Sequence, residues 1–280
     1  MLTGTGAEHL LVVGFDGVRY DTLQAAHTPV LDDLSARGVL LPVQVDRRNP
    51  TISGPVWSTV ATGVNADRHG VLGNGDRPRQ REQFADFLQV LRQQRPGVDT
   101  FVAASWPPIV ARQGPGPIFA QPGWQPGIDR EADEDVPAAS RRADDAVLAY
   151  AVEQLRTREA TAAFVYFGEV DEYGHWRGTG EGYTTSIERC DQRLGELLAT
   201  IDARPARAQE EWTVVVVTDH GHVDGGGHGG ESELERTAWI AAAGPGVGAV
   251  SALCHGDIAA HAAQLFDLSM DVEGVPFGER

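Results

Sequence analysis

The stretch Trp-Thr-Val-Val-Val-Val-Thr-Asp-His-Gly-His spans residues 212–222 and places four consecutive valines before Asp219 and His220. A short apolar run rich in β-branched residues is typical of a buried strand in a parallel sheet. Two other apolar runs end just before Asp16 and Asp171. In open α/β sheets, ligands bind outside the carboxyl ends of the strands. The sequence therefore predicts that these three carboxylates meet at one edge of a sheet.

Strand-like and helix-like patterns alternate along the chain. We expect strands at residues 10–15, 39–45, 100–104, 162–167 and 212–217. Helical patterns occupy residues 28–38, 53–62, 84–91, 138–158 and 183–201. This alternation predicts an α/β fold with a mostly parallel central sheet sandwiched by helices. One domain would cover residues 1–280, with the Pro- and Gly-rich segment 106–137 as a small cap or surface excursion.

The composition excludes several classes of protein. The 280 residues include 40 acidic side chains and 23 basic ones, all of them arginine, for a net charge of −17. Without lysine there is no P-loop lysine and no lysine Schiff base. The negative charge argues against a nucleic-acid polymer or an anionic membrane as the partner. No apolar segment is long enough to cross a membrane and residues 1–9 lack the features of a signal peptide, so we expect a cytoplasmic protein.

Histidines accompany the predicted carboxylates. His175 follows Asp171 by four residues, and a second histidine follows Asp219 directly. His228 comes later, in the glycine-rich run Gly-Gly-Gly-His-Gly-Gly. A hydrogen-bonded turn would account for any one of these histidines. Three carboxylates and three imidazoles together form a ligand set for two divalent metal ions, zinc or, as the alternative, manganese.

A hydroxyl group adds a candidate nucleophile. Ser53, in Asn-Pro-Thr-Ile-Ser-Gly-Pro at residues 49–55, precedes the predicted helix as its N-cap. The positive end of the helix dipole favours an anion there, and a bound metal would further stabilise an alkoxide. Taken alone, the serine fits a simple cap. The neighbouring metal ligands favour the nucleophile instead.

Five stretches carry a resemblance to a known family. They are residues 12–21 (Val-Val-Gly-Phe-Asp-Gly-Val-Arg-Tyr-Asp), 49–55, 58–74, 171–175 (Asp-Glu-Tyr-Gly-His) and 218–222 (Thr-Asp-His-Gly-His). In this order they resemble the alkaline phosphatase superfamily, specifically its type I phosphodiesterase and nucleotide pyrophosphatase branch. The resemblance implies an alkaline phosphatase-like fold and a metal-dependent hydrolase of phosphate esters. Serine at position 53 is a departure, because this branch usually has threonine there.

The resemblance also implies a role for each matching residue. Its two metal sites would be held by Asp16, Ser53, Asp219 and His220 at one and by Asp171, His175 and His228 at the other. Ser53 would attack phosphorus and form a phosphoserine intermediate. Asn74 and the backbone N–H groups at the start of the helix would hold the phosphoryl oxygens. The third histidine of the second site stays open: His228 matches a short arrangement within the superfamily, and His255 and His261 are the alternatives.

The function that follows is hydrolysis of a small phosphorylated molecule by a phosphodiesterase or nucleotide pyrophosphatase. A phosphomonoesterase, a phosphonate hydrolase and a phosphomutase use the same site and stay open. So does a pseudoenzyme that binds metal and phosphate without turnover. A sulfatase is set aside, because no Cys/Ser-x-Pro-x-Arg signature surrounds Ser53. Trp106, Phe119 and Trp124 either stack on a base or pack in the core, and the sequence does not give the oligomeric state.

Overall fold

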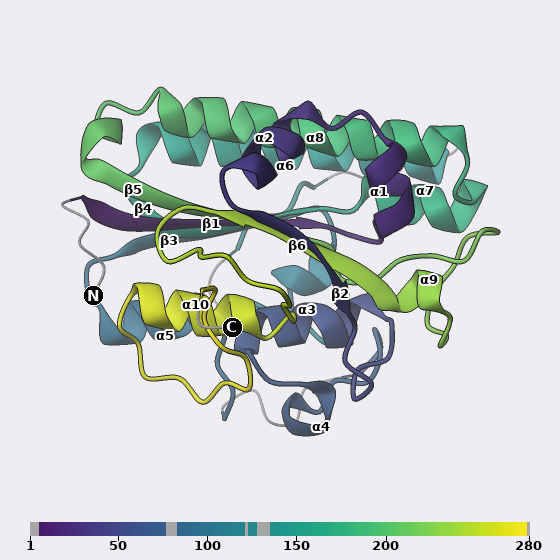
Figure 1. Cartoon of the computed structure of the whole chain (residues 1–280), viewed down its shortest axis with the longest axis horizontal. Coiled ribbons are helices and arrows are strands. Elements are labelled where there is room, and N and C mark those ends of the chain that lie inside the picture. The colour runs from purple at the N-terminus through teal and green to yellow at the C-terminus, as the bar shows by residue number, and fades with distance from the viewer. Residues whose placement is uncertain (1–5, 77–82, 121–122, 128–134, 279–280) are drawn as a thin grey trace.

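The computed structural model describes residues 6–76, 83–120, 123–127 and 135–278 (Figure 1). A six-stranded sheet runs through the middle of the molecule in the order β2-β6-β5-β1-β4-β3. Its strands are β1 (Ala7–Phe15), β2 (Val39–Gln44), β3 (Asp99–Ala104), β4 (Ala160–Phe167), β5 (Glu210–Val217) and β6 (Thr237–Ala243). The five predicted strands are all present, and β6 was not predicted. The sheet is mixed: β5, β1, β4 and β3 are parallel, whereas β6 pairs antiparallel with both β5 and β2.

Helices cover both faces of the sheet, so the α/β fold predicted from the sequence is confirmed (Figure 1). One face carries α1 (Tyr20–Ala25), α2 (Pro29–Ala36), α6 (Val136–Thr157), α7 (Glu169–Arg177) and α8 (Glu181–Asp202). The other carries α3 (Ser53–Thr62), α4 (Ala66–His69), α5 (Phe87–Gln94) and α10 (Asp257–Leu265), and the short α9 (Glu233–Arg236) lies beyond the sheet edge. None of the helices in the described part of the chain has the length and apolar character needed to cross a bilayer.

Alternate side chains of the central strand β1 enter two separate cores. Leu11 and Val13 pack beneath α6 and α8, whereas Leu10 and Val12 pack beneath α3, α5 and α10. A strand that is buried on both faces has a continuous apolar sequence, which is why β1, β4 and β5 could be predicted from the sequence. Gly14 is the exception in this run, because a Cβ there would lie 2.7 Å from the Trp57 ring of α3. The glycine lets α3 approach the end of β1.

The strand register brings the ends of β1, β4 and β5 to one level. Phe15 of β1 pairs with Phe167 of β4, and Gly14 pairs with Val217 of β5. The chain therefore leaves the sheet from neighbouring points just before Asp16, α7 and Asp219. The carboxylates predicted to share one sheet edge do share it.

The helix α7 follows β4 directly and was not predicted. Its first backbone N–H groups are bound by a buried carboxylate of α6, since Asp144 accepts hydrogen bonds from Gly168 (3.0 Å) and Glu169 (2.9 Å). Asp171 and His175 are four residues apart on this helix and therefore lie on the same face. The four-residue spacing of Asp171 and His175 in the sequence therefore corresponds to about one turn of this helix.

The described part of the predicted excursion is residues 106–120, 123–127 and 135–137, of which the last three form the start of α6 and the rest pack closely on the domain. Ile109 and Phe119 are fully buried in the core shared with α3 and α5. Trp124 forms a bridge beside β3, where its backbone pairs with Val102 and Ala104. Residues 121–122 and 128–134 of the same segment lie outside the described residues.

Candidate active site

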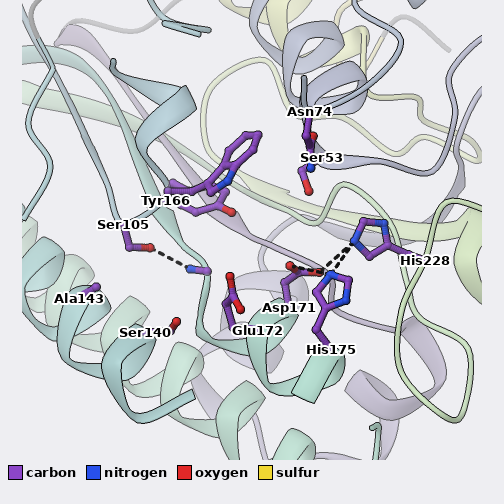
Figure 2. A pocket seen from close by; sticks show the side chains of 12 residues that line it. Ser53, Asn74, Ser105, Ser140, Ala143, Tyr166, Asp171, Glu172, His175 and His228 are labelled. Carbon is purple, nitrogen blue, oxygen red and sulfur yellow. Dashed lines mark hydrogen bonds and ion pairs between the residues drawn. The ribbon is translucent and has the colours of Figure 1, made fainter. Parts of the chain in front are cut away.

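A pocket of about 170 Å³ opens at the carboxyl ends of β3 and β4 (Figure 2). Ser53 and Asn74 form one wall, and the α7 side chains Asp171 and His175 lie across from them with His228. The pocket continues past Trp106 toward α6. It therefore combines the predicted nucleophile with half of the predicted metal ligands.

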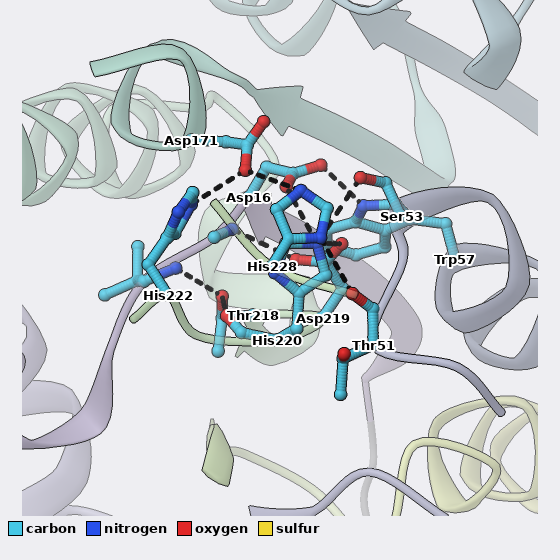
Figure 3. Close-up of polar contacts among 12 residues, drawn as sticks. Asp16, Thr51, Ser53, Trp57, Asp171, Thr218, Asp219, His220, His222 and His228 are labelled. Atoms are coloured by element: carbon cyan, nitrogen blue, oxygen red, sulfur yellow. Dashed lines mark hydrogen bonds and ion pairs between the residues drawn. The ribbon is translucent and has the colours of Figure 1, made fainter. Parts of the chain in front are cut away.

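The deepest group of ligand atoms is Asp16, Asp219 and His220, which we call the β1/β5 cluster (Figure 3). One ligand atom from each residue lies within 4.8 Å of the others. His220 Nε2 is 3.1 Å from Asp219 Oδ2 and 3.8 Å from Asp16 Oδ1. All three side chains are fully buried. The sequence predicted these three residues as one metal site, and the structure brings them together.

The atoms of the β1/β5 cluster lack a partner that carries positive charge. Asp16 Oδ1 and Asp219 Oδ2 accept no hydrogen bond within the described part of the chain. His220 Nδ1 lies 3.1 Å from the Gly221 carbonyl oxygen, which can only accept, so the proton is on Nδ1 and Nε2 presents a lone pair. Buried lone pairs that converge in this way are unfavourable unless a cation binds them. The donor set therefore fits a divalent metal ion.

The acid–base properties of the β1/β5 cluster agree with this interpretation. Burial, followed by repulsion from Asp219 and Asp171, raises the pKa of Asp16 far above its ordinary value. Burial likewise raises the pKa of Asp219 to about 8. Burial lowers the pKa of the His220 imidazole well below its ordinary value. The two raised pKa values oppose the ionised state that a carboxylate ligand adopts, and a bound cation would reverse them, whereas the lowered pKa of His220 favours the neutral imidazole that binds a metal ion.

Two residues that the sequence did not single out orient Asp16. Trp57 Nε1 donates to Asp16 Oδ2 at 2.8 Å, and the Tyr166 hydroxyl donates to the same oxygen. Both donors act on Oδ2, so Oδ1 is directed toward His220. Trp57 lies one turn after Ser53 on α3, and this helical spacing was a signal available in the sequence. Tyr166 carried no comparable signal.

A second group of ligand atoms is Asp171, His175 and His228, which we call the α7 cluster. His175 Nε2 lies 3.4 Å from Asp171 Oδ2, and His228 Nε2 lies 3.5 Å from Asp171 Oδ1. The two Nε2 atoms are 3.0 Å apart. Burial alone would raise the pKa of Asp171, but a hydrogen bond from His222 and the nearby imidazoles hold it below the ordinary value. The two clusters adjoin, since the rings of His220 and His228 stack at 3.7 Å.

The structure places His228, and neither of its alternatives, beside Asp171 and His175. The His228 Nδ1–H donates to the Thr51 carbonyl oxygen at 2.7 Å, which turns the lone pair of Nε2 toward the cluster. His255 Nε2 instead donates to the Thr218 carbonyl oxygen at 2.9 Å, and His261 stacks on Phe277 in the core around α10. The role of His228 as a ligand stays a prediction, now with the geometry that it requires.

Ser53 lies beside the β1/β5 cluster, with Oγ 3.4 Å from His220 Nε2. The sequence predicted Ser53 as the N-cap of its helix, and this was wrong: Ile52 is the N-cap and Ser53 is the first helical residue. The Ser53 hydroxyl makes no capping hydrogen bond because it is directed toward His220. Its position at the positive end of α3 is the one expected for a nucleophile or an anion.

Asn74 reaches the same helix end from the following loop. Its Oδ1 accepts a hydrogen bond from the Gly54 N–H at 2.7 Å. That N–H was expected to hold a phosphoryl oxygen, and in this structure it holds the asparagine. The bond fixes the side-chain amide so that its NH₂ group remains a donor for the pocket that Asn74 lines.

Comparison with known proteins identifies the family. The family model for type I phosphodiesterase / nucleotide pyrophosphatase matches residues 10–255. The chain belongs to this family. It is 24% identical over 223 residues to human ectonucleotide pyrophosphatase/phosphodiesterase family member 5. The aligned region covers 76% of this chain and 45% of that protein. The chain thus spans less than half the length of this curated relative.

Solved structures of this family and of sulfatases share the fold. Murine ectonucleotide pyrophosphatase/phosphodiesterase 5, as an inactive variant in complex with AMP, superposes with a TM-score of 0.68 at 16% identity, covering 95% of this chain and 97% of that one. A 2-O glycosaminoglycan sulfatase superposes with a TM-score of 0.72 at 14% identity, covering 95% of this chain and 72% of that one. At these identities the likeness establishes the alkaline phosphatase-like fold alone.

The family model confirms the recognition made from the sequence. Of the three aromatic residues considered for stacking on a base, the structure leaves Trp106 at the pocket. Phe119 stacks on Phe164 in the core, and Trp124 stacks on Tyr150.

Proposed function

We propose that the chain is a metal-dependent phosphodiesterase or nucleotide pyrophosphatase that uses Ser53 as its nucleophile. One observation carries the proposal: the Ser53 hydroxyl lies 3.4 Å from His220 of the buried β1/β5 cluster and lines the same pocket as the α7 cluster. Asp16, Asp219 and His220 with Ser53 would hold one divalent ion, and Asp171, His175 and His228 would hold the other. Zinc is the ion that this oxygen and nitrogen set favours, with manganese as the alternative.

Two divalent ions bound there supply the positive charge that lowers the pKa of a hydroxyl and stabilises charge on phosphoryl oxygens. The protein positions the Ser53 hydroxyl for attack on the phosphorus atom. Ser53 Oγ attacks phosphorus, forms a serine–phosphate bond and displaces an alcohol or phosphate, which leaves with the proton that Ser53 gave up. Water then cleaves the serine–phosphate bond and restores the hydroxyl. The helix dipole of α3 favours the anionic forms of both groups.

Asn74 stabilises charge that develops on phosphorus-bound oxygen. Its amide is held by the Gly54 N–H at 2.7 Å, so the NH₂ group is oriented before substrate arrives. A preorganised donor of this kind stabilises the transition state more than a mobile one. Trp106 and Glu172 line the same pocket. We assign to them the contacts with the part of the substrate that does not react, with the indole face available for a base or another flat group.

The decisive experiment is hydrolysis of a matched aryl phosphate diester and aryl phosphate monoester after reconstitution with zinc or manganese. We expect faster turnover of the diester, lost on chelation. Ser53→Ala should lower kcat by several orders of magnitude and leave metal content close to wild type. The matched control is Ser58→Ala, which removes a buried hydroxyl from the same helix that donates to Gly54 instead of facing the clusters.

Each competing function gives a different result in this experiment. Faster monoester turnover would assign a phosphomonoesterase or a phosphomutase. Turnover of an aryl phosphonate in preference to both esters would assign a phosphonate hydrolase. Metal binding without any turnover would assign a pseudoenzyme. Full activity of Ser53→Ala would overturn the covalent step.

A further inference from the structure

A fourth histidine lies between the two clusters and belongs to neither. His222 is fully buried, with Nε2 2.9 Å from Asp171 Oδ1 (Figure 3). On the opposite side of the ring, Nδ1 accepts a hydrogen bond from the Gly227 N–H at 3.0 Å. Gly227 directly precedes His228 in the sequence. One imidazole therefore contacts both the carboxylate of the α7 cluster and the loop that carries its third ligand.

The hydrogen bond from Gly227 determines which nitrogen of His222 carries the proton. A backbone N–H can only donate, so Nδ1 must present its lone pair. The proton of the neutral ring is then on Nε2, and this N–H donates a hydrogen bond to Asp171. A ring nitrogen that carries a proton has no free lone pair with which to coordinate a metal ion. His222 is consequently a hydrogen-bond donor to a ligand, although its Nε2 lies as close to Asp171 and His220 as a ligand would.

The surrounding backbone is shaped to accommodate this ring. A Cβ on Gly17 would lie 2.7 Å from His222 Nε2, and a Cβ on Gly174 would lie 2.8 Å from His222 Cε1. Gly17 follows β1 and Gly174 is in α7, so two separate segments leave out a side chain where the ring packs. The Tyr183 ring of α8 closes the site edge-on, with centroids 6.0 Å apart. These contacts enclose the ring beside Asp171.

We propose that His222 is a positioning residue that assembles the α7 cluster. Its Nε2–H fixes the rotamer of Asp171, and its Nδ1 fixes the loop that presents His228. Partners of this kind around a metal ligand typically change metal affinity by about 10-fold to 100-fold when they are removed. The inference rests on the proposed metal sites, but it makes a separate statement about one side chain.

Two conservative variants separate the two hydrogen bonds of His222. Glutamine places an N–H donor near the position of Nε2 and keeps the bond to Asp171. Asparagine places an acceptor near the position of Nδ1 and keeps the bond from Gly227, but it cannot reach Asp171. His261→Asn is the matched control, because His261 is another buried histidine, in α10, outside both clusters.

The test is zinc binding, measured by competition with a chromophoric chelator, together with the ¹⁵N spectrum of the histidine rings. We expect His222→Asn to weaken one of two zinc sites by about 10-fold to 100-fold. His222→Gln, which keeps the bond to Asp171 and loses only the bond from Gly227, should weaken it less, and His261→Asn should bind both ions like wild type. In wild type, Nε2 of His222 should stay protonated before and after zinc is added. Wild-type affinity in His222→Asn, equal losses in both His222 variants, or loss of the Nε2 proton on adding zinc would each overturn the proposal. Wild type that binds no zinc would refute the proposed metal sites instead, and the metal-free ¹⁵N spectrum would still test His222.

Discussion

Replacing Asp219 with asparagine should stabilise the metal-free protein progressively as the pH rises, and should destabilise the metal-loaded protein. In the metal-free protein, Asp219 Oδ2 is buried without a hydrogen-bond donor in the described chain and lies 3.1 Å from His220 Nε2. Asparagine has the same size and can keep the acceptor that binds the Gly17 N–H at 3.0 Å. It carries no charge and takes up no proton, so it removes the cost of either burying an anion or protonating the carboxylate on folding. With metal bound, the same change removes a charged ligand.

The size of the effect follows from the pKa of Asp219. An unfolded aspartate releases its proton near a pH of about 3.9, whereas burial raises the pKa of folded Asp219 to about 8. Between these values the folded state retains a proton that the unfolded state has released. Wild-type stability therefore falls, relative to the asparagine variant, by about 1.4 kcal/mol per pH unit. From pH 5 to pH 7 the difference grows by about 2.7 kcal/mol. Groups that do not interact with Asp219 are the same in both proteins, so their contributions cancel in this comparison.

Urea unfolding with chelator at pH 5, 6 and 7 measures this difference, and the same series with zinc measures its reversal. Zinc at 100 times its Kd should stabilise wild type by about 2.7 kcal/mol for each site, and Asp219→Asn should lose most of this gain at one site. Asp267→Asn is the control, because that side chain is 99% exposed. A difference between wild type and Asp219→Asn that does not change with pH would refute the argument that buried charge is the cost of the metal-free site.

Three further changes test other parts of the site. Tyr166→Phe removes one of the two donors to Asp16 and should weaken zinc binding by about 10-fold to 100-fold in chelator competition; unchanged affinity would show that Trp57 alone orients the carboxylate. Asp144→Asn sets an NH₂ group against a backbone N–H at the start of α7 and should cost about 1–3 kcal/mol in urea unfolding, and a smaller loss would mean that packing alone holds α7. Trp106→Ala should raise KM for an aryl diester more than it lowers kcat; a pure loss of kcat would place Trp106 outside the substrate pocket.

The strands that could be predicted from the sequence differ in composition from β6, which was not predicted. β5 contains Val-Val-Val-Val and β1 contains Leu-Leu-Val-Val, which are strong β-forming patterns. β6 reads Thr-Ala-Trp-Ile-Ala-Ala-Ala, and alanine is not a strand former. It is a strand because β5 and β2 pair with it on both sides and because small side chains suit a strand covered on both faces. These are tertiary effects that a local pattern does not contain.

The α7 helix shows the same limit at the active site. Its residues, Glu-Val-Asp-Glu-Tyr-Gly-His-Trp-Arg, include a glycine and show no apolar stripe, so no helical periodicity was visible. The buried Asp144 of α6 binds its first N–H groups, and its contacts are with α6 and α8. The Asp-x-x-x-His spacing was nevertheless informative, because a four-residue interval suits a shared metal ion only if the segment is helical.

The candidate site residues could be predicted because carboxylates and imidazoles are unusual at these positions. Which atom of each side chain faces the clusters could not be predicted. Asp16, Asp219 and His228 stood out as carboxylates and imidazoles next to strand ends and glycines. Which nitrogen of His228 faces the cluster depends on the carbonyl group of Thr51, which lies 177 positions away in the sequence. In the same way, Tyr166 selects one oxygen of Asp16 from a different strand. Ligand identity is a property of single residues, but ligand direction is set by hydrogen bonds between distant segments, so it appears only once the chain is folded.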